Sequence, residues 1–161
     1  MDFSLSLRAA GSGLRVVGLE TLEEQLSFLE NMPMEQQLAL LDQALLEYDQ
    51  VGEVHKSMVD NYLAGDLQAL KTEAESQLDQ LDQETKDYFI GQGIDARNRR
   101  MLESLLPLLD QSRVFVAVGA LHLPGDMGLI ALLRENGYRL EPELLPFSAS
   151  VQALAKSPGQ E

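Results

Sequence analysis

The segment Val114-Phe-Val-Ala-Val-Gly-Ala-Leu-His122 joins an apolar run to a glycine and a histidine. Residues 114–118 are continuously apolar and rich in valine, which is typical of a strand buried on both faces. Gly119 permits a sharp turn after that strand. A helix over about 126–137 and another strand over 138–140 should follow. We therefore expect a strand–helix–strand unit that crosses over onto a parallel sheet.

A second apolar run, from Leu14 to Leu19, is also short enough to be a buried strand. Thr21 follows this run, and Glu24 lies three residues further on. This is the spacing of a capping box, in which each side chain binds a free backbone N–H of the other residue. The sequence therefore predicts a strand that passes into a helix at Glu20 and Thr21.

A long helical stretch separates the two predicted strands. From Pro33 the apolar residues recur at helical spacing, and Gly91 and Gly93 are predicted to break the chain before a last helix. We predict a mixed α/β fold, with a short, mainly parallel sheet interrupted by a helical insertion at residues 33–110. A length of 161 residues is that of a single domain, residues 1–161.

The composition excludes several classes of function. There are 26 acidic and 12 basic residues, a formal net charge of −14. Such a charge repels a phosphate backbone and an anionic membrane face, so we expect no nucleic-acid partner. The absence of cysteine excludes disulfides, thiolate metal sites and cysteine nucleophiles. No apolar run approaches the ~20 residues that span a bilayer, so no membrane insertion is expected in this chain.

Two candidate site residues follow the two predicted strands. Glu20 comes after the first strand and His122 after the second. Ligands of open α/β sheets bind beyond the carboxyl ends of the strands, so this pair could ligate a divalent metal or act as a general base. Simpler roles stay open. Glu20 could stabilise the N-terminus of the next helix, and His122 could be a loop histidine bound to backbone.

Arg97 and Asn98 are further candidates, at the front of a predicted helix. Turned inward, they would hold an anionic or carbonyl group of a substrate. On the surface, the arginine would form ion pairs with nearby carboxylates that contribute ~0–1 kcal/mol each. His55 lies in a predicted helix beside Lys56, and we assign it to the surface.

Four segments, in this order, resemble the TraB/GumN family, which includes the Tiki proteins. They are Val17-Gly-Leu-Glu-Thr-Leu-Glu-Glu-Gln25, Tyr62-Leu-Ala-Gly-Asp66, Arg97-Asn98 with Met101, and Phe115-Val-Ala-Val-Gly-Ala-Leu-His-Leu-Pro-Gly125. The resemblance covers about residues 2 to 141. It implies a mixed α/β domain related to the erythromycin-esterase and haem-uptake ChaN proteins. Tiki members are described as metal-dependent proteases.

The resemblance also implies site residues. The family's site is built around two Gly-x-x-His motifs and polar residues that include a glutamate. By position, His122 is similar to the second histidine, Glu20 to the glutamate, and Arg97 and Asn98 to a supporting polar pair. The first motif normally lies well upstream of Glu20, and no histidine precedes Glu20 here. We therefore expect a C-terminal portion, a fragment of a larger domain in which a two-histidine metal site is incomplete.

The implied function is a metal-dependent hydrolase of a peptide or a small acyl substrate. His122 and Glu20 would be ligands of a divalent ion, and Glu20, Arg97 and Asn98 would act in catalysis. The isolated chain should be inactive. An alternative is a non-catalytic module that binds a peptide or protein through the acidic helical insertion. A homodimer formed through an exposed sheet edge is a further expectation, and the resemblance favours a bacterial periplasmic or exported protein.

Overall fold

The structure is a computed structural model that describes residues 2–111 and 113–143. Every regular element within these residues is a helix. The helices are α1 (Asp2–Gly11), α2 (Leu22–Glu30), α3 (Met34–Leu46), α4 (Val51–Ala64), α5 (Leu67–Ser76), α6 (Gln83–Ile90), α7 (Ala96–Leu109) and α8 (Leu129–Glu135), with the short turns η1 (Tyr48–Gln50), η2 (Gly91–Asp95) and η3 (Ala120–His122). None of the helices in this part of the chain is long and apolar enough to cross a membrane.

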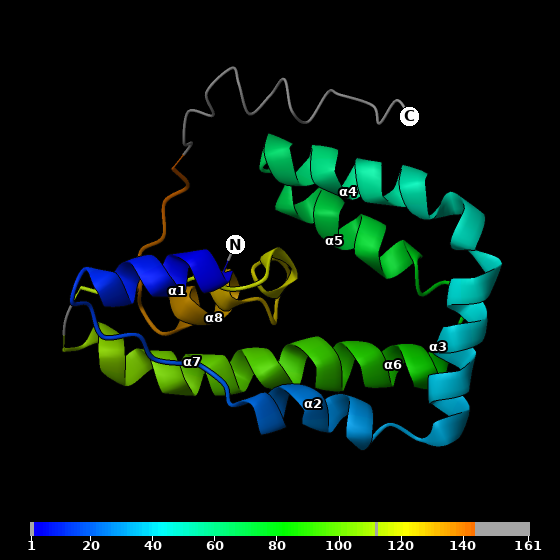
Figure 1. Cartoon of the computed structure of the whole chain (residues 1–161), viewed down its shortest axis with the longest axis horizontal. Coiled ribbons are helices and arrows are strands. Elements are labelled where there is room, and N and C mark those ends of the chain that lie inside the picture. Colours follow the sequence, from blue (N-terminus) through cyan, green and yellow to red (C-terminus); the bar gives the residue numbers. More distant parts are fainter. Residues whose placement is uncertain (1, 112, 144–161) are drawn as a thin grey trace.

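The predicted α/β class is wrong: the described residues fold as an all-helical structure without a sheet. All three predicted strands, residues 14–19, 114–118 and 138–140, lack regular secondary structure (Figure 1). A strand needs a neighbour that accepts and donates its backbone hydrogen bonds, and these runs have none among the described residues. Phe115 is 81% exposed, so the run is not covered on both faces either. The sheet edge on which the homodimer was expected is therefore not formed here.

Helices α6 and α7 form one long rod, because η2 continues the helix between them (Figure 1). The predicted break at Gly91 and Gly93 is wrong. The backbone at Gly91 stays right-handed helical, and η2 is a turn of π-helix. Such turns insert an extra residue into a helix and are frequent at functional sites. Helix α2 packs on this rod through Phe28, whose ring meets that of Phe89 edge-on at 5.8 Å.

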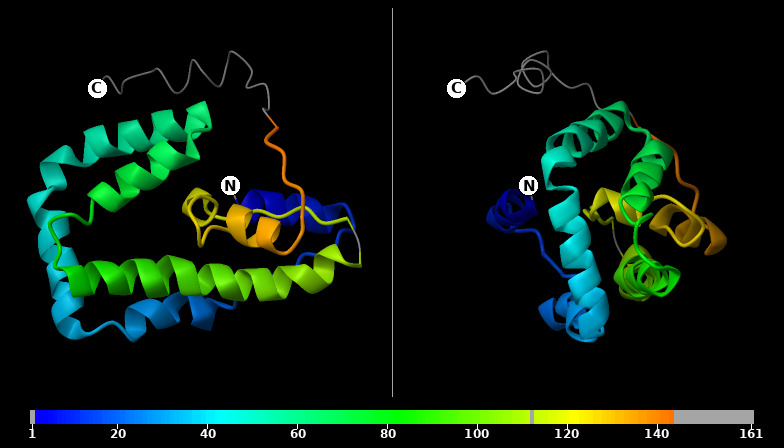
Figure 2. Two further views of the ribbon diagram at one scale, coloured as in Figure 1. Left: turned by 180° about the vertical axis from the view of Figure 1, so that it is seen from behind. Right: turned by 90° about the vertical axis from the view of Figure 1, so that its right-hand side faces the viewer.

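Short-range signals place most helix ends correctly. The capping box of Thr21 and Glu24 is present at the start of α2, with both reciprocal bonds. Gly65 is left-handed, with φ of 71°, and ends α4, while Asp66 accepts from Ala69 N–H and begins α5. The two helices pack side by side as a hairpin (Figure 2).

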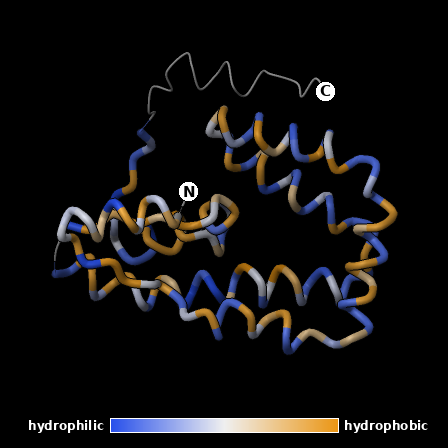
Figure 3. The backbone as a smooth tube through the Cα atoms, viewed as in Figure 1, coloured by the Kyte–Doolittle hydropathy of each residue, from blue (hydrophilic) through white to orange (hydrophobic). Residues whose placement is uncertain are grey.

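The main core lies between α7 and α8. Its buried members are Met101, Leu102, Leu129 and Leu132. Many other large apolar residues stay exposed, and hydrophobic positions recur along most of the backbone (Figure 3). Leu123 and Met127 of the segment 119–128 pack against this core. The turn η3 also contacts both η2 and α5. These contacts position the candidate site.

Candidate functional site

Glu20 and Arg97 form a two-point ion pair, although they are 77 residues apart in the sequence. Arg97 Nε donates to Glu20 Oε1 at 2.9 Å, and Nη2 donates to Oε2 at 2.8 Å. The Glu20 side chain is 3% exposed and that of Arg97 is 17% exposed. The hydrogen bond with Glu20 raises the pKa of Arg97 above its ordinary value, against an opposing effect of burial. Both charged groups are therefore largely shielded from solvent.

Two glycines shape the surroundings of this pair. At Gly18, a Cβ atom would lie 2.9 Å from the carbonyl oxygen of Glu20, so the turn that presents Glu20 has no room for a side chain. Gly93, in the π-helical turn, accepts a hydrogen bond of 3.3 Å from Arg97 Nη1 through its carbonyl oxygen. A Cβ atom on Gly93 would lie 3.3 Å from the ring of Phe28. Helix α2 and the rod thus meet closely at the residues that support Arg97.

Asn98 and His122 form a second buried contact beside the first. Asn98 is fully buried, and its Nδ2 donates to the carbonyl oxygen of Met127 at 2.7 Å. Its Oδ1 lies 2.7 Å from His122 Nδ1. An amide oxygen can only accept, so Nδ1 must carry the proton. The carbonyl of Met127 therefore fixes the amide, and the amide fixes the tautomer of the imidazole.

The environment of His122 favours the neutral imidazole. Burial lowers its pKa below the ordinary value of 6.5, the positive charge of Arg97 lowers it further, and Glu20 opposes both effects. With the proton on Nδ1, the lone pair lies on Nε2. The structure shows no hydrogen bond to Nε2 from any residue that it describes. An imidazole in this state can bind a metal or accept a proton.

The structure thus brings together Glu20, Arg97, Asn98 and His122, the residues that the sequence predicted for the site. His55 is not among them: it is exposed on α4. Gly52 precedes His55 by three residues, as Gly119 precedes His122, so spacing does not distinguish the two histidines. Their surroundings do. His55 lies on a helix surface, whereas His122 lies in η3 and is 7% exposed.

The four residues do not make up a complete metal site. Protein sites for zinc take three or four histidine, cysteine or carboxylate ligands. No group of three such residues with suitable geometry occurs among the described residues. Both oxygens of Glu20 already bind Arg97. The roles of His122 and Glu20 as metal ligands stay predictions, and the chemistry that this chain shows by itself is a neutral, oriented imidazole.

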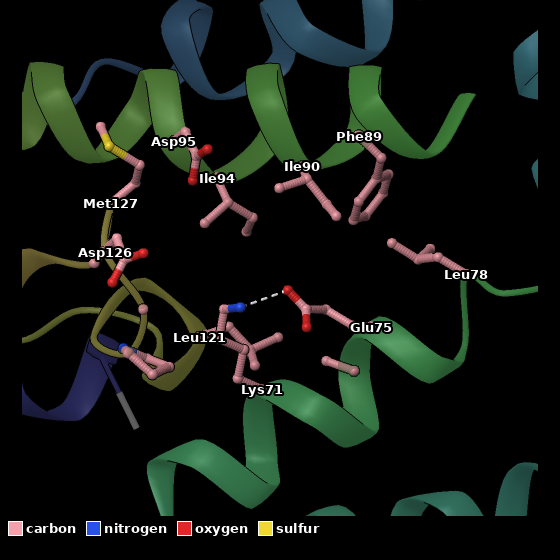
Figure 4. Close-up of a pocket in the computed structure, with 14 residues that line it drawn as sticks. Lys71, Glu75, Leu78, Phe89, Ile90, Ile94, Asp95, Leu121, Asp126 and Met127 are labelled. Atoms are coloured by element: carbon pink, nitrogen blue, oxygen red, sulfur yellow. Dashed lines mark ion pairs between the residues drawn. The ribbon is translucent and has the colours of Figure 1, made fainter. Parts of the chain in front are cut away.

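A cavity of about 250 Å³ lies next to this cluster, between α5, the rod and the segment 121–128 (Figure 4). The four polar residues do not line it, but their neighbours do. Leu121 precedes His122, Asp95 lies just before Arg97, and Met127 supplies the carbonyl that holds Asn98. The cavity and the polar cluster therefore share their supporting backbone.

Comparison with known proteins adds a lineage to this geometry. The family model described as the TraB/PrgY/gumN family matches residues 1–142. The chain belongs to this family. No solved structure matches it.

Several proteins of similar sequence are named as metalloproteases. The chain is 29% identical to "Metalloprotease TIKI2" of Xenopus tropicalis over 88% of its own length and 31% of the relative's. It is 28% identical to "Metalloprotease TIKI1" of Danio rerio and 26% identical to "Metalloprotease TIKI homolog" of Nematostella vectensis, with 33% and 35% of those chains covered. The chain thus spans about a third of the length of these relatives.

Sequence reasoning missed three supports of this candidate site. Met127 acts through its backbone carbonyl, which no side-chain pattern reveals. The π-helical turn at Gly91–Asp95 was taken for a break, although paired glycines ahead of Arg97 were the available signal. Gly128 is a further support: a Cβ atom there would lie 2.3 Å from the carbonyl oxygens of Leu123 and Pro124. The helix predicted over about 126–137 starts later than expected, because Gly128 is the N-cap of α8.

Proposed function

We propose that this chain supplies one part of the active site of a metal-dependent hydrolase of peptide or other acyl substrates, with His122 as a metal ligand through Nε2. The observation that carries the proposal is the hydrogen bond between Asn98 Oδ1 and His122 Nδ1. Metal-binding histidines commonly donate their second ring N–H to an oxygen acceptor, which fixes the ring for coordination. The metalloprotease names of the relatives support the same reading.

Each of the other residues has a supporting role in this proposal. Asn98 orients the imidazole. Arg97 favours the neutral imidazole, because its positive charge disfavours the protonated form. Glu20 is a positioning residue, since its carboxylate holds the guanidinium of Arg97 at two points. A divalent ion, when bound, would supply polarisation of a substrate carbonyl.

The chain by itself should lack hydrolytic activity under this proposal. One imidazole and one carboxylate that is already paired do not form a tight site, because affinity depends on the number of ligands and their geometry. We therefore expect weak, selective divalent-ion binding at His122 and no turnover of peptide or ester substrates. The activity of a whole protein of the relatives' length is part of the proposal.

Paramagnetic relaxation tests the ligand role directly. We would titrate the chain with Mn²⁺ and follow the ring signals of His122 and His55 by NMR. The proposal predicts that His122 broadens at lower Mn²⁺ concentration than His55. In His122→Ala, broadening of the neighbouring Leu121 and Leu123 signals should be lost, whereas the matched variant His55→Ala should leave it unchanged. Unchanged His122 signals at concentrations that broaden His55 would refute the ligand role.

The alternative is a non-catalytic module that binds a peptide through the helical insertion. The cavity between α5 and the rod favours this alternative, because it is built largely from insertion residues such as Ala74, Leu78 and Phe89. The two functions differ in what His122 does. If His122→Ala leaves both metal binding and peptide binding unchanged, the histidine is structural and the binding module is the better description.

A further inference from the structure

The cavity beside the polar cluster is of a size that suits one side chain. Its volume is about 250 Å³. An engineered cavity of ~150 Å³ in another protein binds benzene, whereas sites for whole drug-sized ligands run from ~300 to 1,000 Å³. A single leucine, methionine or phenylalanine side chain therefore fits, and a larger molecule would extend beyond the cavity.

Apolar side chains form the middle and one side of the cavity. Figure 4 shows Ile90, Ile94 and Leu121 pointing into it, with Phe89 and Leu78 on the side away from Met127. These side chains come from the rod, from η3 and from the chain after α5. Such a lining favours an apolar occupant, because burial removes apolar surface from water.

The cavity is lined by more negative than positive side chains. Lys71 Nζ pairs with Glu75 at 2.6 Å, so these two charges offset each other. Asp95, on the rod, and Asp126, on the segment 121–128, both line the cavity on the side of Met127, away from Phe89 (Figure 4). Neither carboxylate has an ion-pair partner within residues 2–111 and 113–143. The remaining charge on this side is therefore negative, and the net charge of −14 on the whole chain adds a field of the same sign.

The negative side of the cavity is also the side nearest the polar cluster. Asp95 is the last residue of η2, two residues before Arg97, and the backbone carbonyl of Met127 accepts a hydrogen bond from Asn98. A peptide with one side chain in the cavity would therefore pass the cluster with its next residue beside the two carboxylates. The geometry therefore suits a peptide with one apolar side chain in the cavity and a positively charged residue next to it.

We propose that the cavity is a side-chain subsite for a peptide, which takes an apolar residue and binds a lysine or arginine next to it through Asp95 and Asp126. The peptide nature of the occupant rests on the proposed function, but binding in the cavity needs neither a metal nor turnover. The two proposals can therefore fail separately.

The test is a methyl NMR titration of the full chain without metal. The probes are N-acetyl-Leu-Lys-amide, the charge-reversed N-acetyl-Leu-Glu-amide and the truncated N-acetyl-Gly-Lys-amide. We expect saturable shifts of the Ile90, Ile94 and Leu121 methyl groups with the first probe. The charge-reversed probe should bind about tenfold more weakly, because two partly exposed ion pairs are lost. The truncated probe should bind at least about tenfold more weakly, because no apolar side chain is buried.

Variants separate the cavity from the rest of the surface. Ala74→Phe fills the cavity and should abolish the shifts, while Ala64→Phe adds the same ring at an exposed helical position and should leave binding intact. Asp95→Asn combined with Asp126→Asn should remove most of the preference for lysine over glutamate. Asp42→Asn, at an exposed position on α3, is the matched control and should keep it.

The proposal is overturned if the first probe produces no saturable shift at these methyl groups in the unmodified chain. Equal affinities for the lysine and glutamate probes would equally overturn the charge assignment. If Ala74→Phe does not fold, the probe series on the unmodified chain still decides. Saturable shifts in a chain whose His122 signals fail the Mn²⁺ test would support the subsite and count against the role of His122 as a metal ligand.

Discussion

Asn98 and His122 lie 24 residues apart in the sequence and share a buried bond of 2.7 Å. Asn98 lies in the first turn of α7 and is buried, and His122 is the last residue of η3. Because the amide nitrogen of Asn98 is committed to Met127, its oxygen faces the imidazole. This relationship turns a loop histidine into an oriented, neutral base, and the predictions below depend on it.

Replacing Asn98 with alanine should destabilise the chain by about 2–4 kcal/mol. The change leaves the Met127 carbonyl and the His122 Nδ1–H without partners, and each buried polar group without a partner costs about 1–3 kcal/mol. Denaturant unfolding measures the free energy of unfolding. The control is Asn31→Ala at an exposed position, which should change it by less than about 0.5 kcal/mol. Equal effects of the two substitutions would contradict the buried role of Asn98.

The pair formed by Glu20 and Arg97 should be strongly coupled. Removing one partner leaves the other charge buried, so we expect Glu20→Gln and Arg97→Gln each to cost about 3 kcal/mol. The double variant should cost much less than the sum, because neither charge is then left alone. A double-mutant cycle of unfolding free energies gives the coupling. Additive costs would show that the two-point contact contributes little in solution.

Stability should fall as pH falls through the titration of His122. Its folded-state pKa is lowered below the ordinary 6.5, mainly by burial. The unfolded chain therefore takes up a proton first, and the stabilisation present above about pH 6.5 is lost towards the folded-state pKa. We expect His122→Gln to flatten this dependence and His55→Gln to leave it in place. Unfolding free energies at about pH 7.5 and about pH 5.5 make the comparison. A His122→Gln variant with an unchanged slope would be incompatible with the assignment.

Two glycine substitutions should have opposite effects. Gly128→Ala places a Cβ atom 2.3 Å from two carbonyl oxygens, so the loop that carries His122 has to move. We expect a loss of more than about 2 kcal/mol. Gly52 lies inside α4 with nothing within 4 Å of the added atom. Gly52→Ala should therefore stabilise the chain by about 0.5–1 kcal/mol. Thermal unfolding of the two variants checks the signs.

The sequence predicted local features of this fold better than its class. The Thr21–Glu24 capping box was predicted from residues three apart and is confirmed. The end of α4 at Gly65 and the Asp66 cap of α5 depend on equally local interactions. The strand at residues 114–118 was predicted from its apolar, valine-rich composition alone. Whether a valine-rich run becomes a strand depends on a partner elsewhere, and the described residues provide none.

The candidate site shows the same division. Residue type and family resemblance selected Glu20 and His122, and the structure places both in one cluster with Arg97 and Asn98. The two-point pairing of Glu20 with Arg97 spans 77 residues, so no local pattern could indicate that its oxygens are occupied. The carbonyl of Met127 and the π-helical turn at Gly91–Asp95 act through backbone geometry, which residue types do not reveal.

The most direct test of the account is the tautomer of His122, read from the ring nitrogens by long-range ¹H–¹⁵N NMR of the full chain near neutral pH. The account predicts a proton on Nδ1 and an unprotonated Nε2, because Asn98 Oδ1 accepts from Nδ1 at 2.7 Å. The exposed His55 supplies the internal reference for an unconstrained ring. A proton found on Nε2 instead, or averaged ring signals like those of His55, would contradict the central claim.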